Sequence, residues 1–289
     1  MPTWDRPVPD KDFLACPTWT GAVTNWFYQL QDVNPMIVAT VKADVKVVDP
    51  TEDGRKPWNR SAVDMLRGLN KSHVLAYLSI GEAEDYRAYW DRRWTDTRLP
   101  TPAAPNWLSK ENPEWKGNYK VQYWDPEWQR IVFRQLDEIV HQGFDGVYLD
   151  IIDAYEYWED LGHAEAPALM VEFVEALAAR ARRINPDFWI VPQNGDGLLK
   201  FEPYCRCIDA IAREDLFFGG NGDKPNDYAT LVGSLKNLDR LRAMGKTVLV
   251  VEYLTKGSRQ AEDAITAAYK FGYVPYITTR ELNKPTEPC

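Results

Sequence analysis

The chain has 289 residues, of which 45% are hydrophobic and 27% charged. This length suits one large domain such as an α/β barrel, which typically needs about 250 residues, so residues 1–289 are expected to form a single domain. No window approaches the run of about 18 apolar residues that a membrane-spanning helix requires. The 34 basic residues are not clustered and are outnumbered by 43 acidic ones, giving a net charge of −9, which disfavours nucleic acid as a partner.

The start of the chain, MPTWDRPVPDKDF, has neither the basic region nor the apolar region of a signal peptide. A chain whose leader had been cut off and replaced would look the same at this end. The protein is therefore expected to be secreted or periplasmic if a leader was removed, and cytoplasmic otherwise. The sequence does not indicate the oligomeric state.

A short apolar run, a polar turn and an amphipathic helix recur along the chain, which is the pattern of alternating strands and helices. Near-continuous apolar runs are typical of parallel strands buried on both faces. Alternation of eight such runs with helices predicts a closed (β/α)8 barrel of the TIM type. The strands are expected at 25–31, 36–44, 73–81, 143–153, 187–195, 207–215, 247–255 and 273–281, and helices at 59–70, 126–141, 165–183, 228–244 and 258–270.

A long insertion follows the third predicted strand, so the barrel is expected to be somewhat irregular. Residues 82–125 are rich in Pro and Trp and show little periodicity, and long segments of this kind commonly form part of a functional site. Nine tryptophans, five of them in this insertion, lie largely in turn-like or amphipathic stretches. They either pack in the core and at its edges or stack on sugar rings: Trp26, Trp58, Trp90, Trp94, Trp107, Trp115, Trp124, Trp128 and Trp158.

Metal-ligating residues are sparse. The chain has three histidines, which is few for a metal-dependent hydrolase barrel. Cys205 and Cys207 are too closely spaced for a usual zinc pair, and no second pair accompanies them. A disulfide from Cys16 to a later cysteine is compatible with the sequence but cannot be deduced from it. Neither a metal nor a cofactor is expected.

Several predicted strands end in carboxylates or amides. In a parallel barrel these C-terminal ends meet at one face, where barrel enzymes hold their active sites. A single acid there is equally well explained as a helix N-cap or an ion-pair partner, so the signal comes from the set as a whole. The set comprises Ser79, Gly81, Glu82 and Glu84, then Asp150 and Asp153, then Gln193 and Asn194, then Glu214 and Asp215, and finally Glu252 and Tyr253.

The acids of this set differ in their expected roles. Asp150 directly follows the apolar VYL and should emerge at the rim of the barrel, whereas Asp153 could instead cap the next helix. Glu214 and Glu252 are of a residue type that caps helices poorly, which favours a role in binding or catalysis. Asp145 precedes its strand, lies at the opposite end and is expected to be structural. Two carboxylates facing one cavity, one ionised and one protonated, would meet the requirement for glycoside hydrolysis.

Five segments of the chain resemble glycoside hydrolase family 114, in particular its bacterial and archaeal branch. Their order and approximate spacing match over most of the chain, and the second segment is the most specific. YLDIID stands where fungal members carry a Pro-Asp-Asn-type stretch. The segments are YLSIGEAEDYR (77–87), GFDGVYLDIIDAYEYW (143–158), VPQNGDGLL (191–199), EDLFF (214–218) and VLVVEYLT (248–255).

This resemblance implies a barrel that cleaves α-1,4 linkages within a galactosamine-containing polysaccharide. Asp150 would be the nucleophile and Glu214 the general acid/base of a retaining pair. A polymer of free-amine hexosamine is cationic near neutral pH, and acidic residues would attract it. The resemblance places the following residues around the substrate: Ser79, Glu82, Glu84, Arg87, Asp153, Tyr155, Gln193, Asn194, Glu252 and Tyr253.

Two other classes of function stay open. One is a carbohydrate-binding barrel without turnover, which would bind oligosaccharides and release no reducing ends. The other is a different barrel hydrolase or lyase, with or without a metal. The sequence does not define the sugar, the linkage or the stereochemical course.

Overall fold

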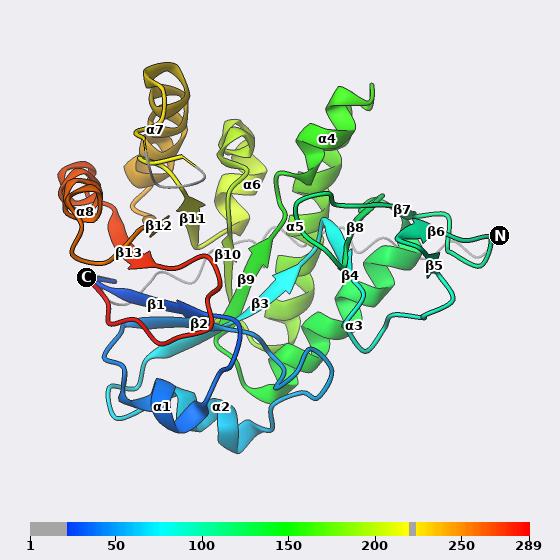
Figure 1. Ribbon diagram of the computed structural model, residues 1–289, viewed down its shortest axis with the longest axis horizontal. Coiled ribbons are helices and arrows are strands. Elements are labelled where there is room, and N and C mark those ends of the chain that lie inside the picture. The colour runs from blue at the N-terminus through cyan, green and yellow to red at the C-terminus, as the bar shows by residue number, and fades with distance from the viewer. Residues whose placement is uncertain (1–21, 220–223) are drawn as a thin grey trace.

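The computed structural model describes residues 22–219 and 224–289 (Figure 1). Cys16, and with it the disulfide considered for it, lies outside these residues. In the described part of the chain, Cys205, Cys207 and Cys289 form no disulfide with one another, and Cys205 and Cys207 are buried.

Eight parallel strands form the centre of the fold. Hydrogen bonds join them into a five-stranded sheet, in the order β1-β2-β3-β9-β10, and a three-stranded sheet, in the order β11-β12-β13. The strands are β1 (Trp26–Gln29), β2 (Val45–Val48), β3 (His73–Ser79), β9 (Gly146–Asp150), β10 (Trp189–Pro192), β11 (Ala210–Glu214), β12 (Thr247–Tyr253) and β13 (Val274–Thr278).

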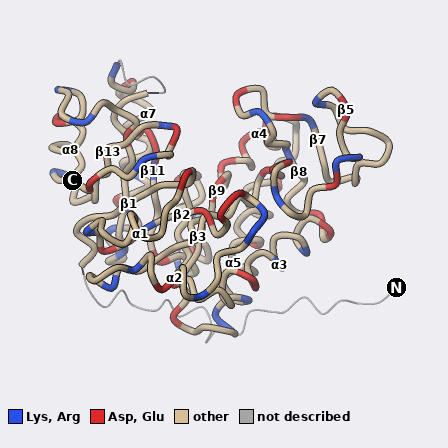
Figure 2. Tube along the Cα trace, turned by 60° about the horizontal axis from the view of Figure 1, so that its bottom comes forward, with Lys and Arg blue, Asp and Glu red and all other residues tan. Residues whose placement is uncertain are grey.

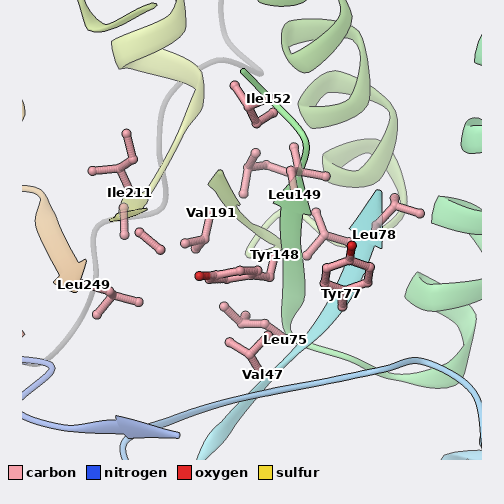
Figure 3. Close-up of a cluster of buried hydrophobic side chains, with 14 of the residues drawn as sticks. Val47, Leu75, Tyr77, Leu78, Tyr148, Leu149, Ile152, Val191, Ile211 and Leu249 are labelled. Carbon is pink, nitrogen blue, oxygen red and sulfur yellow. The ribbon is translucent and has the colours of Figure 1, made fainter. Parts of the chain in front are cut away.

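The two sheets meet at both edges, which gives an irregular α/β barrel. An isolated parallel bridge between Gln193 and Ala212 connects β10 to β11. At the other seam, the indole of Trp26 in β1 donates a hydrogen bond of 3.1 Å to the carbonyl of Val274 in β13. Buried side chains such as Val47, Tyr148 and Leu249 fill the space that the strands surround (Figure 3).

Helices lie outside the strands, as expected for this fold (Figure 1). The five predicted helices are confirmed. Four of them start at side-chain caps. Asp125, for example, accepts a hydrogen bond from the Glu127 amide at the start of α3, and Asp227 accepts from the Ala229 and Thr230 amides at the start of α7. The helices are α1 (Pro35–Thr40), α2 (Arg60–Arg67), α3 (Pro126–Gln142), α4 (Ala154–Asp160), α5 (Ala166–Ile184), the 3-10 helix η2 (Asp196–Lys200), α6 (Glu202–Cys207), α7 (Tyr228–Ala243) and α8 (Arg259–Phe271).

The strand predicted at 36–44 is wrong. Most of this segment is helix α1, which starts because the side chain of Asn34 caps the amides of Met36 and Ile37 and Pro35 occupies the first turn. The second strand begins only at Val45. Its Lys46 interrupts the apolar pattern but is fully buried, and its ammonium group donates to the carbonyls of Val38 and Leu66 at 2.8 and 2.9 Å.

The insertion after β3 is a folded layer. A three-stranded antiparallel sheet, β4-β8-β7, and the hairpin β5-β6 form it. Most of the tryptophans named above are buried, Trp94 and Trp124 are half-buried, and Trp115 is exposed, so packing accounts for most of them. The strands are β4 (Glu82–Glu84), β5 (Thr95–Asp96), β6 (Leu99–Pro100), β7 (Leu108–Glu111) and β8 (Asn118–Val121).

Candidate active site

The C-terminal ends of β3, β9, β10 and β11 bring the predicted site residues to one rim. Ser79 is aligned with Asp150 in the parallel ladder between β3 and β9. Gln193, one residue beyond β10, pairs with Ala212 in β11, two residues before Glu214. Acidic residues lie between α4 on one side and α7 and α8 on the other (Figure 2). The register therefore places Asp150 and Glu214 on strands separated only by β10.

Asp150 is half-buried and its two oxygens accept hydrogen bonds from separate donors. The hydroxyl of Tyr77 donates to Oδ2 at 2.7 Å, and the amide of Ile151 donates to Oδ1 at 2.8 Å. Burial raises the pKa of Asp150 well above its usual value, and the charge of Glu214 raises it further. The two carboxyls therefore interact electrostatically, as expected for residues of one site.

Glu214 is also half-buried and is fixed from two sides. The Tyr253 hydroxyl donates to its Oε1, and the side-chain amide of Asn194 donates to Oε2 at 2.9 Å. The Asn194 oxygen in turn accepts from the amide of Glu214 at 3.1 Å and from the guanidinium of Arg213 at 2.8 Å. Asn194 and Tyr253, both predicted to line the substrate site, hold the Glu214 carboxylate in this structure.

Asp153 lies one residue before α4 and its side chain does not cap that helix. Its role as an N-cap, which the sequence left open, is thereby excluded. Burial, followed by the charges of Glu156 and Glu214, raises the pKa of Asp153 to about 6. Because it is half-buried and interacts with Glu214, Asp153 is a third carboxyl of the same rim.

Three further predicted residues lie close to this rim. The hydroxyl of Ser79 donates to the carbonyl of Glu82 at 2.9 Å and so holds the turn between β3 and β4. Gln193 is buried and accepts from the Tyr28 hydroxyl at 3.3 Å. The hydroxyl of Tyr155 in α4 donates to the exposed carboxylate of Glu156 at 3.1 Å.

Glu82, Glu84 and Arg87 are buried in contacts with other protein groups. Glu82 accepts from the ammonium of Lys120 at 2.7 Å. Arg87 pairs with Glu84 at 2.7 Å and with Asp49 at 2.8 Å. The structure therefore places these three residues in the wall between β3 and the insertion. A cavity of about 380 Å³ adjoins Arg87 between the β2–α2 loop and α3, and none of the three rim carboxylates lines it.

Glu252 in β12 is buried and braces the segment after β11. Its Oε1 accepts from the amide of Phe217 at 2.7 Å and its Oε2 from the amide of Phe218 at 3.2 Å. Burial raises its pKa to about 7, against the opposing effect of these two amides. Both oxygens of this carboxylate are therefore hydrogen-bonded to backbone amides of the protein.

The pKa of Glu252 predicts how stability depends on pH. A carboxyl whose pKa is raised on folding binds its proton more tightly in the folded state than in the unfolded state. The pKa of Glu252 is about 4.5 when unfolded and about 7 when folded. Its contribution to stability therefore falls as the pH rises from the first value to the second. Between pH 5 and pH 7.5 this effect should lower the unfolding free energy of wild type by about 2 kcal/mol. Glu252→Gln should lack this decrease. Urea titrations at both pH values measure this. The exposed Glu262→Gln is the matched control, and a slope equal to wild type in Glu252→Gln would contradict the prediction.

Asp145 is structural, as the sequence indicated. It forms an ion pair with Arg67 and accepts from the amide of Val74 at 2.7 Å, at the start of β3 and away from the rim. Within residues 22–219 and 224–289 there is no group of three or more His, Cys, Asp or Glu side chains arranged to hold a metal ion. None of the helices in the described part of the chain has the length and apolar character needed to cross a bilayer.

The sequence analysis missed two contributors to the site. Tyr77 donates to Asp150, and Arg213 contacts Asn194 and the carbonyl of Glu214. Tyr77 could have been found, because it precedes Ser79 by two residues and alternate residues of a strand point to the same face. The sequence carries no comparable signal for Arg213. It lies in the apolar run of β11, and its salt-bridge partner Asp196 could not be predicted from the sequence.

An α/β barrel that carries two interacting carboxyls at the C-terminal ends of its strands has the architecture of a glycoside hydrolase. Residues 10–289 match the model of glycoside-hydrolase family GH114. The chain therefore belongs to this family, is a glycosidase and acts on a carbohydrate substrate.

Two relatives are similar to most of the chain. The chain is 38% identical over 275 residues to uncharacterized protein MJ1477 of Methanocaldococcus jannaschii, covering 90% of this chain and 77% of that protein. It is 35% identical over 277 residues to an uncharacterized protein of Thermotoga maritima, covering 91% and 83%.

Two solved structures share the fold at low sequence identity. The glycoside hydrolase domain of PelA from Pseudomonas aeruginosa aligns with a TM-score of 0.69 at 18% identity, covering 92% of this chain and 99% of that one. Aspergillus fumigatus Ega3, in complex with galactosamine, aligns with a TM-score of 0.70 at 20% identity, covering 94% and 97%. These likenesses support the irregular α/β barrel.

Proposed function

We propose that this glycosidase cleaves α-1,4 linkages within a galactosamine-containing polysaccharide with retention of configuration. Asp150 is the nucleophile and Glu214 the general acid/base. The observation that carries the proposal is the electrostatic interaction of these two half-buried carboxyls, each held by a tyrosine hydroxyl, at one rim of the barrel. The galactosamine bound to the structurally similar Ega3 supports an amino sugar as the substrate.

The reaction would proceed in two displacements. An oxygen of Asp150 attacks the anomeric carbon while the bond to the leaving oxygen breaks, and Glu214 gives its proton to that oxygen. Glu214 then takes a proton from water, and this water displaces Asp150 and releases the sugar. The reaction needs one proton in the pair, on Glu214, with Asp150 ionised. Burial and the charge of Glu214 raise the pKa of Asp150, so a proton on Glu214 is what allows Asp150 to ionise, because it removes that charge.

Of the remaining predicted site residues, some would contact the sugar and others would support the site. Asp153 is half-buried and carries a negative charge that attracts the ammonium group of the sugar once the carboxyl is ionised. Tyr155 interacts electrostatically with Asp153, and Gln193 lies between the ends of β10 and β11. Ser79, Glu82, Glu84, Arg87, Asn194, Glu252 and Tyr253 each bond to other protein groups and would shape the site by supporting its walls and its carboxyls.

The test is digestion of a de-N-acetylated α-1,4-galactosamine polymer, with mass spectrometry of the products. Endo cleavage should give a ladder of short oligosaccharides, and proton NMR at early times should show the α-anomer first. The fully N-acetylated polymer is the matched substrate control and should be cleaved more slowly, since it lacks the positive charge. Binding of oligosaccharides without release of reducing ends would instead favour a carbohydrate-binding barrel. Activity that a chelator abolishes would favour metal-assisted chemistry.

A further inference from the structure

Ile151 has an unusual backbone conformation. It directly follows Asp150 at the end of β9 and has a φ of 58°, in the left-handed region that β-branched residues strongly disfavour. Thr97, another β-branched residue with positive φ in the described part of the chain, lies with Arg98 in the two-residue turn of the β5–β6 hairpin. A turn of this kind requires positive φ at both positions, whereas Ile151 is not in a hairpin.

The next two strands around the barrel, β10 and β11, end in the same way. Asn194 has a φ of 60° and follows Gln193, while Asp215 has a φ of 47° and follows Glu214. Left-handed residues thus occur at three adjacent strand ends, each directly after a residue of the candidate site. Backbone strain of this kind persists only where the surrounding structure enforces it, and it is frequent at active sites.

The conformation of Ile151 has two direct consequences for the site. Its amide points back to Asp150 and donates to Oδ1 at 2.8 Å. Its carbonyl accepts from the amide of Ala154, the first residue of α4, at 3.3 Å. The turn therefore orients the Asp150 carboxylate and also starts the segment that carries Asp153.

Gly81 meets Ile151 from the opposite side. A Cβ at position 81 would lie 2.1 Å from the carbonyl oxygen of Ile151 and 2.8 Å from its Cγ2. The backbone and the side chain of Ile151 therefore fill the space beside Gly81, at the junction of β3 and β4. A glycine at 151 would adopt the left-handed conformation more easily, but it would lack the side chain that makes this contact.

We propose that Ile151 is a positioning residue for Asp150: packed against Gly81, it holds the left-handed turn that directs its own amide to the carboxylate. This inference rests on the proposed function in so far as Asp150 takes part in the reaction. Glycine at this position would favour the left-handed conformation but would lose the packing against Gly81, so the turn would no longer be held in one orientation.

Kinetics of Ile151→Gly on the amino-sugar polymer test the proposal. A misplaced carboxylate should lower kcat by at least about tenfold and leave KM within about twofold, because substrate binding is retained while positioning is lost. Ile151→Val keeps the β-branched side chain and should keep kcat within about threefold of wild type. Thr97→Gly makes the same kind of change in the β5–β6 hairpin and should leave kcat unchanged. Wild-type kcat in Ile151→Gly would overturn the proposal.

A second measurement does not depend on activity. Carbon NMR of the labelled aspartate carboxyls, with Asp150 assigned from the Asp150→Asn variant, gives its pKa in the free protein. If the amide of residue 151 is no longer directed to Oδ1, this pKa should be higher in Ile151→Gly than in wild type, and an unchanged pKa would overturn the proposal. If wild type does not cleave the polymer, the proposed function fails, and this titration still decides whether Ile151 positions Asp150.

Discussion

Asp150→Asn is expected to lower the cleavage rate by at least about a thousandfold, and Glu214→Gln by about a hundredfold to ten thousandfold. Asparagine cannot form the covalent glycosyl intermediate, and glutamine cannot give a proton to the leaving oxygen. Reducing-end assays on the amino-sugar polymer measure both effects. Full activity in both variants would remove this pair of residues from the mechanism.

Loss of folding would not explain these effects. Burial and the charge of Glu214 disfavour the ionised form of Asp150, so replacing it with a neutral residue should leave the melting temperature equal to or above that of wild type. Asp160→Asn makes the same chemical change at the exposed C-terminal end of α4 and should keep full activity.

Chemical rescue by azide distinguishes the roles of the two residues. With an aryl α-glycoside of a galactosamine oligosaccharide, Asp150→Gly and azide should yield the β-glycosyl azide, because azide replaces the nucleophile in a single displacement. Glu214→Gly and azide should yield the α-glycosyl azide, because azide attacks the covalent intermediate in place of water. The opposite pair of products would exchange the two assignments, and the raised pKa of Asp150 makes that outcome worth testing.

The sequence predicted most strands because each is a short apolar run, buried on both faces, that needs no distant information to be identified. It failed at 36–44, where the same residue types form α1 because Asn34 and Pro35 start a helix. It also missed the strand around Lys46, whose burial depends on the carbonyls of Val38 in α1 and Leu66 in α2, 8 and 20 residues away in the chain. Local patterns cannot report such long-range hydrogen bonds.

The candidate site was predictable to a similar extent. Strand-end acids such as Asp150 and Glu214 could be identified, since the C-terminal ends of parallel strands meet at one face. The partners of these acids could not, because the bond from Tyr253 to Glu214 and the pairing of Arg87 with Asp49 join residues 38 or more positions apart. Glu84 and Arg87 were expected at the substrate, and the sequence did not predict that they also bond to each other.

The largest expected effect on stability comes from Asp209, at the entry to β11. Its carboxylate accepts from the guanidinium of Arg182 in α5 at 2.8 Å and from the amide of Ile190 in β10 at 2.6 Å. Both side chains are buried, with 2% of the Arg182 side chain and 0% of the Asp209 side chain exposed. Asp209→Ala would leave the guanidinium charge buried without this partner, which should cost about 3–5 kcal/mol of unfolding free energy.

The same helix provides a matched control. Arg180 binds Asp137 in α3 through two hydrogen bonds of 2.7 and 2.6 Å, but 44% of the Arg180 side chain and 29% of the Asp137 side chain are exposed. Water therefore solvates the charge that remains after Asp137→Ala, and the expected loss is at most about 1 kcal/mol. Denaturant titration of both variants measures the difference. The double variant Arg182→Met/Asp209→Leu should recover much of the stability lost in Asp209→Ala, because it leaves no unpaired charge in the core. An equal or larger loss of unfolding free energy in the double variant would contradict this. It would show that the ion pair itself, and not the isolated charge, determines the stability of this junction.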